Sequence, residues 1–149
     1  MRLALYQPDQ AGNVGAILRT AACFGVPIDI ILPCGFPWSD RALKRAGMDY
    51  AERAQVTAHA DWDAFEARLP GRLVLLTTSG GTRIDQADFR ADDTVLMGSE
   101  SSGVPLNVHA RADIAVRIPQ VAGTRSLNIA VAAGIALGEA LRQTGGWPS

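Results

Sequence analysis

Cysteine and histidine are scarce in this 149-residue chain, which has two of each. Cys23 and Cys34 have neither a second pair nor the spacing of metal ligands, so the pattern favours a reducing compartment and a cytoplasmic protein. His59 and His109 lie far apart in the sequence, and neither has a cluster of cysteine or histidine nearby. We therefore expect no metal site.

Long apolar runs and an imbalance of charge are also lacking. No hydrophobic stretch approaches the length that spans a bilayer, and Pro8 interrupts the N-terminal segment too early for a signal peptide. The formal net charge is −1, so no strong global field attracts nucleic acid. A membrane partner is not expected, and any RNA binding must come from a local basic patch, or from patches doubled in a dimer.

Two nucleotide-binding fingerprints are missing as well. The chain has no Gly-x-x-x-x-Gly-Lys-Ser/Thr segment, which excludes a P-loop, and no Gly-x-Gly-x-x-Gly follows its first predicted strand. Hydrophobic residues make up 48% of the chain, which is enough for a packed core and too much for a disordered chain. Since no linker or repeat is visible, we expect one domain over residues 1–149.

The chain does contain an alternation of apolar strand-like runs and helical patterns. This predicts an α/β fold with a mostly parallel sheet flanked by helices. Strands are expected at residues 2–6, 28–32, 54–57, 72–77, 94–97 and 114–118. Helices are expected after Asn13 and Asp61, each acting as an N-cap, and over Ser126–Thr144. Residues 79–82 are expected to form a flexible turn.

Three of these strands end in loops of small and polar residues. The loops begin at Leu76-Thr77, at Gly98-Ser99-Glu100 and at Ile118, and the last one reaches Ser126-Leu127-Asn128. In an open α/β sheet ligands bind outside the carboxyl ends of the strands, so the three loops predict a pocket. Its hydrogen-bonding lining suits a purine edge and a ribose better than a triphosphate. The alternative, that these are plain turns between elements, stays open.

Several charged residues have two interpretations each. Arg19 lies beside the apolar stripe of the first helix and could bind a phosphate or carboxylate, or could be an ordinary surface arginine. Arg41, Lys44 and Arg45 share a helical face near aromatic residues, which is typical of an RNA-binding surface and also of a solvated helix. Glu100 could bind a ligand or cap a neighbouring helix.

The last predicted helix is rich in alanine and contains Gly134 and Gly138. Glycine inside a helix costs about 1 kcal/mol relative to alanine, so two of them indicate a packing reason. Small side chains let helices approach closely, either within the chain or across a symmetric dimer.

Three motifs occur in order along the chain. They are Asn13-Val-Gly-Ala-Ile-Leu-Arg19-Thr20, then Leu96-Met-Gly98-Ser99-Glu100-Ser-Ser-Gly103-Val-Pro105, and finally Ile118-Pro119 with Ser126-Leu127-Asn128-Ile129. Together they resemble the motifs of the SpoU branch of the SPOUT RNA methyltransferases. Residues 35–50 are similar to the minimal, single-domain group that methylates the wobble ribose of tRNA.

The resemblance implies a deep trefoil knot at the C-terminal end of the sheet, S-adenosylmethionine as the cofactor, and an obligate homodimer. The residues that it assigns to cofactor binding lie in the three loops: Leu76, Thr77, Gly98, Ile118, Ser126 and Leu127. The residues that it assigns to the catalytic motifs are polar: Asn13, Arg19, Glu100 and Asn128. The expected RNA-binding residues are basic: Arg41, Lys44 and Arg45.

The implied activity is methyl transfer to the 2′-hydroxyl of the wobble nucleotide, a cytidine or uridine, in the tRNA anticodon loop. Arg19 would hold the adjacent RNA phosphate and stabilise the developing alkoxide, because a guanidinium does not readily lose its proton. The alternatives are methylation of another tRNA or rRNA position, and a non-catalytic module of the same fold that binds RNA or a nucleotide.

The sequence departs from the pattern of the wobble-ribose group in three places. Ser101-Ser102 stands where Thr-Arg is frequent, which removes an arginine that would face the RNA. Ala130 replaces a serine at the start of the last helix, and Gly138 replaces a helix tyrosine that bears on the dimer interface.

Overall fold

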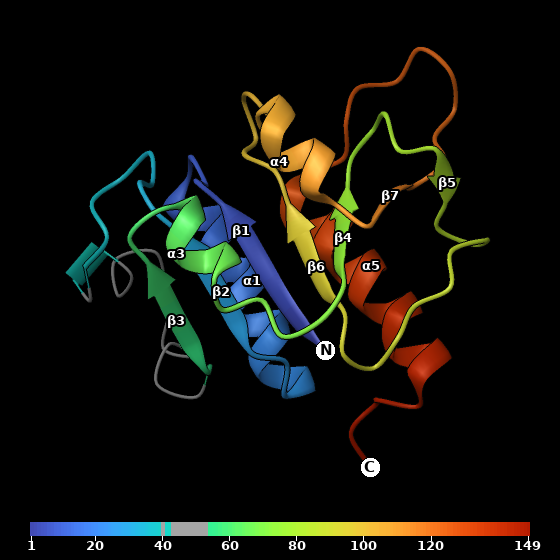
Figure 1. Ribbon diagram of the computed structural model, residues 1–149, viewed down its shortest axis with the longest axis horizontal. Helices are drawn as coiled ribbons and strands as arrows, with labels where there is room; N and C mark the ends of the chain where they lie inside the picture. Colours follow the sequence, from blue (N-terminus) through green and yellow to red (C-terminus); the bar gives the residue numbers. More distant parts are fainter. Residues whose placement is uncertain (40, 43–53) are drawn as a thin grey trace.

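The structure is a computed structural model that describes residues 1–39, 41–42 and 54–149. In this part of the chain seven strands form one sheet in the order β3-β2-β1-β6-β4-β7-β5, and all neighbouring strands are parallel (Figure 1). The strands are β1 (Arg2–Tyr6), β2 (Ile28–Ile31), β3 (Val56–His59), β4 (Leu73–Leu76), β5 (Thr82–Arg83), β6 (Thr94–Met97) and β7 (Ile114–Arg117). The helices are α1 (Ala11–Phe24), α3 (Trp62–Glu66), α4 (Leu106–Arg111) and α5 (Ile129–Thr144).

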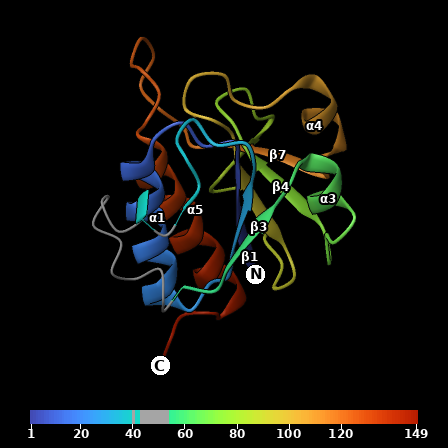
Figure 2. The same ribbon diagram turned by 90° about the vertical axis from the view of Figure 1, so that its left-hand side faces the viewer.

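The sheet lies between two layers of helices (Figure 2). Helices α1 and α5 pack side by side on one face, where Ile17 and Leu137 join the larger core cluster. Helices α3 and α4 cover the other face, where Phe65 and Val108 join a second cluster. Side chains alternate between the faces of each strand, so the central strands are buried on both sides. The predicted parallel α/β sheet flanked by helices is confirmed.

The order of the strands reverses beside β1. From β1 the chain adds β2 and β3 on one side, whereas β6, β4 and β7 lie on the other. In a parallel sheet the carboxyl ends of neighbouring strands meet at one edge, and a reversal of order opens a crevice between the loops there. This edge is where the sequence predicts a pocket.

Helix α1 begins earlier than the sequence indicates. Its first residue is Ala11 and its N-cap is Gln10, which makes no side-chain capping bond, so the prediction that Asn13 caps the helix is wrong. The local capping rule fails because a residue distant in the sequence binds the N–H groups of the preceding loop, as described below. At the other end Gly25 takes a left-handed conformation with φ 67°, and its N–H bonds to carbonyls of the last turn.

Helix α5 begins later than expected, at Ile129. Asn128 is its N-cap, and its Oδ1 accepts from the N–H groups of Ala130 at 2.8 Å and Val131 at 3.3 Å. An N-cap residue takes non-helical dihedral angles, so Ser126 stays in the loop and the predicted start of the helix there is wrong. Asp61 caps α3 as expected.

The predicted flexible turn after β4 is wrong over its last residue, because Thr82–Arg83 pair with β7 as strand β5. A Cβ on Gly80 would lie 2.5 Å from the carbonyl carbon of Val116, so glycine allows the turn to approach β7. Nη1 of Arg117 donates to the carbonyl oxygens of Gly80 at 2.8 Å and Gly81 at 3.1 Å. These contacts order the segment, although its two paired residues are too few for an alternating pattern to reveal.

The C-terminal tail folds back onto α5. The indole of Trp147 packs edge-on against Phe24 with ring centroids 4.9 Å apart, and it lies 3.9 Å from where a Cβ on Gly138 would be. An aromatic ring from the tail therefore covers the helix position that has no side chain of its own. Over the described ranges, none of the helices has the length and apolar character that crossing a bilayer requires.

Candidate active site

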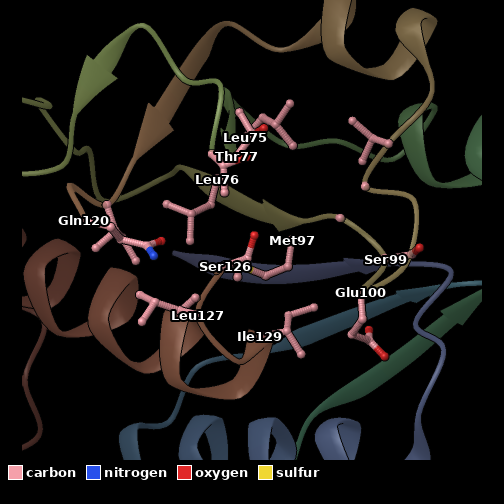
Figure 3. Close-up of a pocket in the computed structure, with 16 residues that line it drawn as sticks. Leu75, Leu76, Thr77, Met97, Ser99, Glu100, Gln120, Ser126, Leu127 and Ile129 are labelled. Atoms are coloured by element: carbon pink, nitrogen blue, oxygen red, sulfur yellow. The ribbon is translucent and has the colours of Figure 1, made fainter. Parts of the chain in front are cut away.

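A pocket opens where β4, β6 and β7 end (Figure 3). Its cavity has a volume of about 240 Å³ and is lined by residues from three segments, 75–78, 97–104 and 118–132. All six residues expected to hold a cofactor lie in its wall: Leu76, Thr77, Gly98, Ile118, Ser126 and Leu127. The prediction that three loops distant in the sequence form one pocket is confirmed.

The wall combines aliphatic side chains with neutral hydrogen-bonding groups. Leu76, Ile118 and Leu127 supply apolar surface, and Thr77 and Ser126 supply hydroxyl groups. Such a lining can bind a ligand that carries a flat apolar ring together with polar groups. Within the described ranges, no three histidine, cysteine, aspartate or glutamate side chains gather where they could hold a metal ion.

Sequence reasoning missed Gln120, which also lines the pocket. Its Nε2 donates to the carbonyl oxygen of Arg125 at 2.8 Å and to Oγ1 of Thr124 at 3.4 Å. These bonds link the two ends of residues 120–125 within the loop between β7 and α5. The available signal was the position of Gln120 directly after Ile118-Pro119, where a strand leads into the pocket.

The loop after β6 is held in a tight turn. Ser99 and Gly103 exchange backbone hydrogen bonds of 3.0 and 2.9 Å, and the hydroxyl groups of Ser99 and Ser102 lie 2.9 Å apart. A Cβ on Gly98 would lie 2.8 Å from the Cα of Gly103, so the two sides of the turn touch through their backbones. The pocket wall formed by this loop thus depends on glycine at Gly98.

Glu100 connects this loop to the start of α1. Its Oε2 accepts from the N–H groups of Asp9 at 3.0 Å and Gln10 at 2.9 Å. In return Oδ2 of Asp9 accepts from the N–H of Ser101 at 2.8 Å, and bonds from the Ser101 hydroxyl and N–H hold the pKa of Asp9 below its ordinary value. Burial, reinforced by the charge of Glu100, raises the pKa of the Cys34 thiol to about 11. Glu100 therefore binds the backbone of the loop that leads into α1, and it also borders the pocket.

The second oxygen of Glu100 differs from the first. Oε1 is buried and has no hydrogen-bond partner among the described residues. In Figure 3 the side chain lies at the end of the pocket opposite Gln120 and apart from Ser126 and Leu127. Only one oxygen of the carboxylate, Oε2, is therefore bonded to the backbone of the loop before α1.

Asn13 and Asn128 also bind each other. Nδ2 of Asn128 donates to Oδ1 of Asn13 at 3.1 Å, while Oδ1 of Asn128 caps α5. This pair joins the first turn of α1 to the N-terminus of α5. Three of the four expected catalytic residues, Asn13, Glu100 and Asn128, thus meet at the N-termini of the two helices that cover one face of the sheet.

The two expected basic residues that the structure describes, Arg19 and Arg41, do not line the pocket. Arg19 is on the exposed side of α1 and is not among the residues that line the pocket of its own subunit. Arg41 is exposed as well. Lys44 and Arg45 lie outside the described residues.

A parallel sheet whose order reverses, with a pocket formed by three loops at its carboxyl edge, defines an open α/β protein with its pocket where such sheets bind ligands. The chain belongs to the SpoU rRNA Methylase family, whose model matches residues 1–138. The resemblance drawn from the three motifs is thereby confirmed.

Individual relatives match the chain over nearly its whole length. The tRNA (cytidine(34)-2'-O)-methyltransferase of Ancylobacter novellus is 49% identical over an alignment of 150 positions, which covers 99% of this chain and 95% of the relative. A solved structure that concerns the 2-OH methylation of C/U34 on tRNA has a TM-score of 0.89 and 42% identity, covering 95% of this chain and 94% of that one. An AdoMet-bound rRNA methyltransferase from Sinorhizobium meliloti has a TM-score of 0.83 and 29% identity, covering 95% of this chain and 55% of that one.

Proposed function

We propose that the protein transfers a methyl group from S-adenosylmethionine to the ribose 2′-hydroxyl of nucleotide 34, a cytidine or uridine, in the tRNA anticodon loop. The pocket built from the three motif loops carries this proposal. The names of the similar proteins, which match over nearly the full length, support the choice of nucleotide. A tRNA substrate makes the cytoplasm the expected compartment.

The wall of the pocket fits S-adenosylmethionine. The cofactor combines a flat purine with hydroxyl and amino-acid groups, and the wall offers aliphatic surface from Leu76, Ile118 and Leu127 beside the hydroxyls of Thr77 and Ser126. These five residues, with the backbone at Gly98, would hold it. When bound, the cofactor supplies a methyl carbon made electrophilic by the adjacent sulfonium.

Asn13, Glu100 and Asn128 serve as positioning residues in this proposal. Each has polar atoms that bind backbone at a helix start or bind one another, with distances between 2.8 and 3.3 Å. Groups engaged in this way orient the two helices and the pocket loop.

Arg19 is the proposed catalytic residue, and it serves the pocket of the partner subunit. It projects from the exposed side of α1, beside the exposed side of α5, so a second copy docked on these helices would meet it. Its guanidinium would hold the phosphate next to the reacting ribose and stabilise negative charge on the 2′-oxygen. The proton of the hydroxyl leaves to the phosphate or to water, because arginine keeps its own proton.

A homodimer through α1 and α5 follows from the same surface. Val131 is 53% exposed and Ile135 is 41% exposed, one turn apart on α5, and a Cβ on Gly134 would meet nothing within 4 Å. We expect Ile135→Glu to shift sedimentation from dimer to monomer at micromolar concentration, because a charge would be buried in the interface. The control is Leu106→Glu on α4, which is 89% exposed on the opposite layer. A dimeric Ile135→Glu variant would contradict this interface.

The trefoil knot is proposed within one domain that spans residues 1–149. Its support is the path of the chain after β7, which meets the loops after β4 and β6 at the pocket and returns as α5 beside α1. Pulling a single molecule from both termini tests the knot. A tightened knot leaves the extended chain shorter than the contour length of 149 residues, about 3.4 Å each. Extension to the full contour length would exclude it.

Tritiated S-adenosylmethionine and two tRNA transcripts test the activity. One transcript has an ordinary ribose at nucleotide 34 and the other already carries a 2′-O-methyl group there. We expect label only in the first, in a 2′-O-methyl nucleoside. Equal labelling of both transcripts indicates another position, and labelling of an rRNA sample incubated in parallel, with none in either transcript, indicates a different substrate. Binding of the cofactor without transfer to any RNA indicates a non-catalytic module.

The same assay tests Arg19. Arg19→Ala should lower turnover by at least 100-fold, on the scale of losing an oxyanion-stabilising group, and leave the affinity for S-adenosylmethionine unchanged. Arg90→Ala is a matched control, because Arg90 is also exposed and lines neither this pocket nor the second cleft described below. Wild-type turnover by Arg19→Ala would reject the assignment.

A further inference from the structure

A second cleft, of about 250 Å³, lies on the side of the sheet that ends in strand β3, against α3. It is lined in part by Arg2 of β1, Asp29 of β2, Thr57 and His59 of β3, and Arg68 in the loop after α3. The layer of α3 is the one opposite α1 and α5 (Figure 2). The cleft therefore stays open when two subunits pack through α1 and α5.

The acidic residue of this cleft is already neutralised. Asp29 is 4% exposed and accepts from Nε of Arg2 at 2.7 Å, from Nη2 of Arg2 at 3.0 Å and from Nε2 of His59 at 2.8 Å. A carboxylate with three such donors has little capacity left for a cation. The buried trio instead fixes the guanidinium of Arg2 at the wall of the cleft.

The groups that remain to bind a ligand are donors. Nη1 of Arg2 and the whole guanidinium of Arg68 have no hydrogen-bond or ion-pair partner among the described residues. The hydroxyl of the exposed Thr57 lies in the same cleft on β3, an edge strand. With Asp29 offset by Arg2, Arg68 leaves the lining with an excess positive charge.

We propose that this cleft binds a phosphate group, and that its natural source is the backbone of the substrate RNA. Two guanidinium groups and a hydroxyl match the geometry and charge of phosphate oxygens. The net charge of the whole chain is −1, so contact with a long polyanion depends on local sites of this kind. The choice of RNA as the source rests on the proposed function, whereas the phosphate chemistry rests on the cleft alone.

The phosphate chemistry is tested without any enzymatic activity. Inorganic phosphate and a short oligouridylate are titrated separately into the protein while the backbone amide resonances of Thr57 and His59 are followed. Saturable shifts with either probe, absent in Arg68→Glu and retained in Arg90→Glu, support a phosphate site. Arg90 is the matched control because it is exposed and does not line the cleft. No shift with either probe overturns the proposal.

The source of the phosphate is tested through the salt dependence of tRNA affinity. Losing one phosphate contact should weaken tRNA binding by Arg68→Glu about five- to tenfold at 0.1 M salt. It should also reduce the slope of log affinity against log salt by about 0.7–0.9, which a purely structural change would not do. The melting temperature and the affinity for S-adenosylmethionine should match the wild type.

An unchanged slope would show that the RNA backbone does not occupy the cleft, and a site that still binds inorganic phosphate would then be one for free phosphate only. Methylation by the wild-type protein is measured in parallel. If the wild type methylates tRNA and the slope does not change in Arg68→Glu, the RNA backbone is not the source of the phosphate, and the proposed function stands. If the wild type does not methylate tRNA and phosphate still binds, the proposed function fails and the phosphate site stands.

Discussion

Replacing Glu100 by glutamine and by alanine separates the two interpretations of this residue. Oε2 of Glu100 accepts from the N–H groups of Asp9 and Gln10, whereas Oε1 is buried without a partner among the described residues. Glutamine keeps an oxygen in place of Oε2 but cannot take up or release a proton. Alanine removes both the acceptor and the charge near the N-terminus of α1.

The magnitudes follow from the two hydrogen bonds. A bond to a charged acceptor contributes about 1.5–3 kcal/mol, but water can replace part of it here because Gln10 is exposed. With about 0.5 kcal/mol for the charge at the helix N-terminus, Glu100→Ala should lower the free energy of unfolding by about 2–3 kcal/mol. Glu100→Gln should cost about 1 kcal/mol, because both bonds persist as neutral ones and no charge is left on the buried side.

Thermal unfolding and single-turnover methylation are the assays. For a chain of this size 1 kcal/mol corresponds to about 2–4 °C, so we expect shifts of about 3 °C for glutamine and 5–10 °C for alanine. Turnover by Glu100→Gln should stay within about tenfold of the wild type, and its pH profile should not change. A general acid or base contributes about 100- to 10,000-fold. A glutamine variant with normal stability and a loss of that size would refute the positioning role.

Three further predictions concern the pocket and the stability of the fold. Gly98→Ala should weaken S-adenosylmethionine binding more than tenfold by calorimetry, because its Cβ would lie 2.8 Å from backbone across the loop. Asp93→Ala should lower the free energy of unfolding in urea by about 3–5 kcal/mol, because Asp93 is 0% exposed and its loss leaves Arg72 without its 2.8 Å partner. Glu139, bonded chiefly to Arg142, has its pKa lowered from 4.5 to about 2. This lowered pKa adds stability above pH 4.5 that is lost as the pH falls towards 2, so Glu139→Gln should flatten the acid limb of the stability curve.

The pocket could be predicted because it follows from the topology of parallel sheets. Small polar residues after three apolar strands were visible in the sequence, and parallel strands bring their carboxyl ends to the same edge. The polar residues of the cofactor loops, such as Thr77 and Ser126, therefore needed no long-range information beyond the strand assignments. Gln120 was missed although it directly follows Ile118-Pro119, because its side-chain bonds to Thr124 and Arg125 form only in the folded loop.

The start of α1 was predicted wrongly because it depends on a contact between residues far apart in the sequence. Asn13 has the side chain of an N-cap, but α1 begins before it because Glu100, about 90 residues away, binds the preceding N–H groups. The second cleft was missed for a similar reason, because Arg2, Asp29 and His59 come from three different strands. Capping rules describe neighbours in sequence, so contacts made only after folding lie beyond them.

One polar framework connects the pocket with the exposed face of α1 and α5. Asn13 binds Asn128, which starts α5, and Glu100 of the pocket loop holds the start of α1. Arg19 stands six residues after Asn13, about 9 Å along a rigid helix, so fixing the first turn fixes the direction in which Arg19 projects. In the proposed mechanism the motif residues would set the position of the guanidinium through the helix that carries it. These residues come from three separate motifs and meet at the starts of α1 and α5, where Glu100 also borders the pocket.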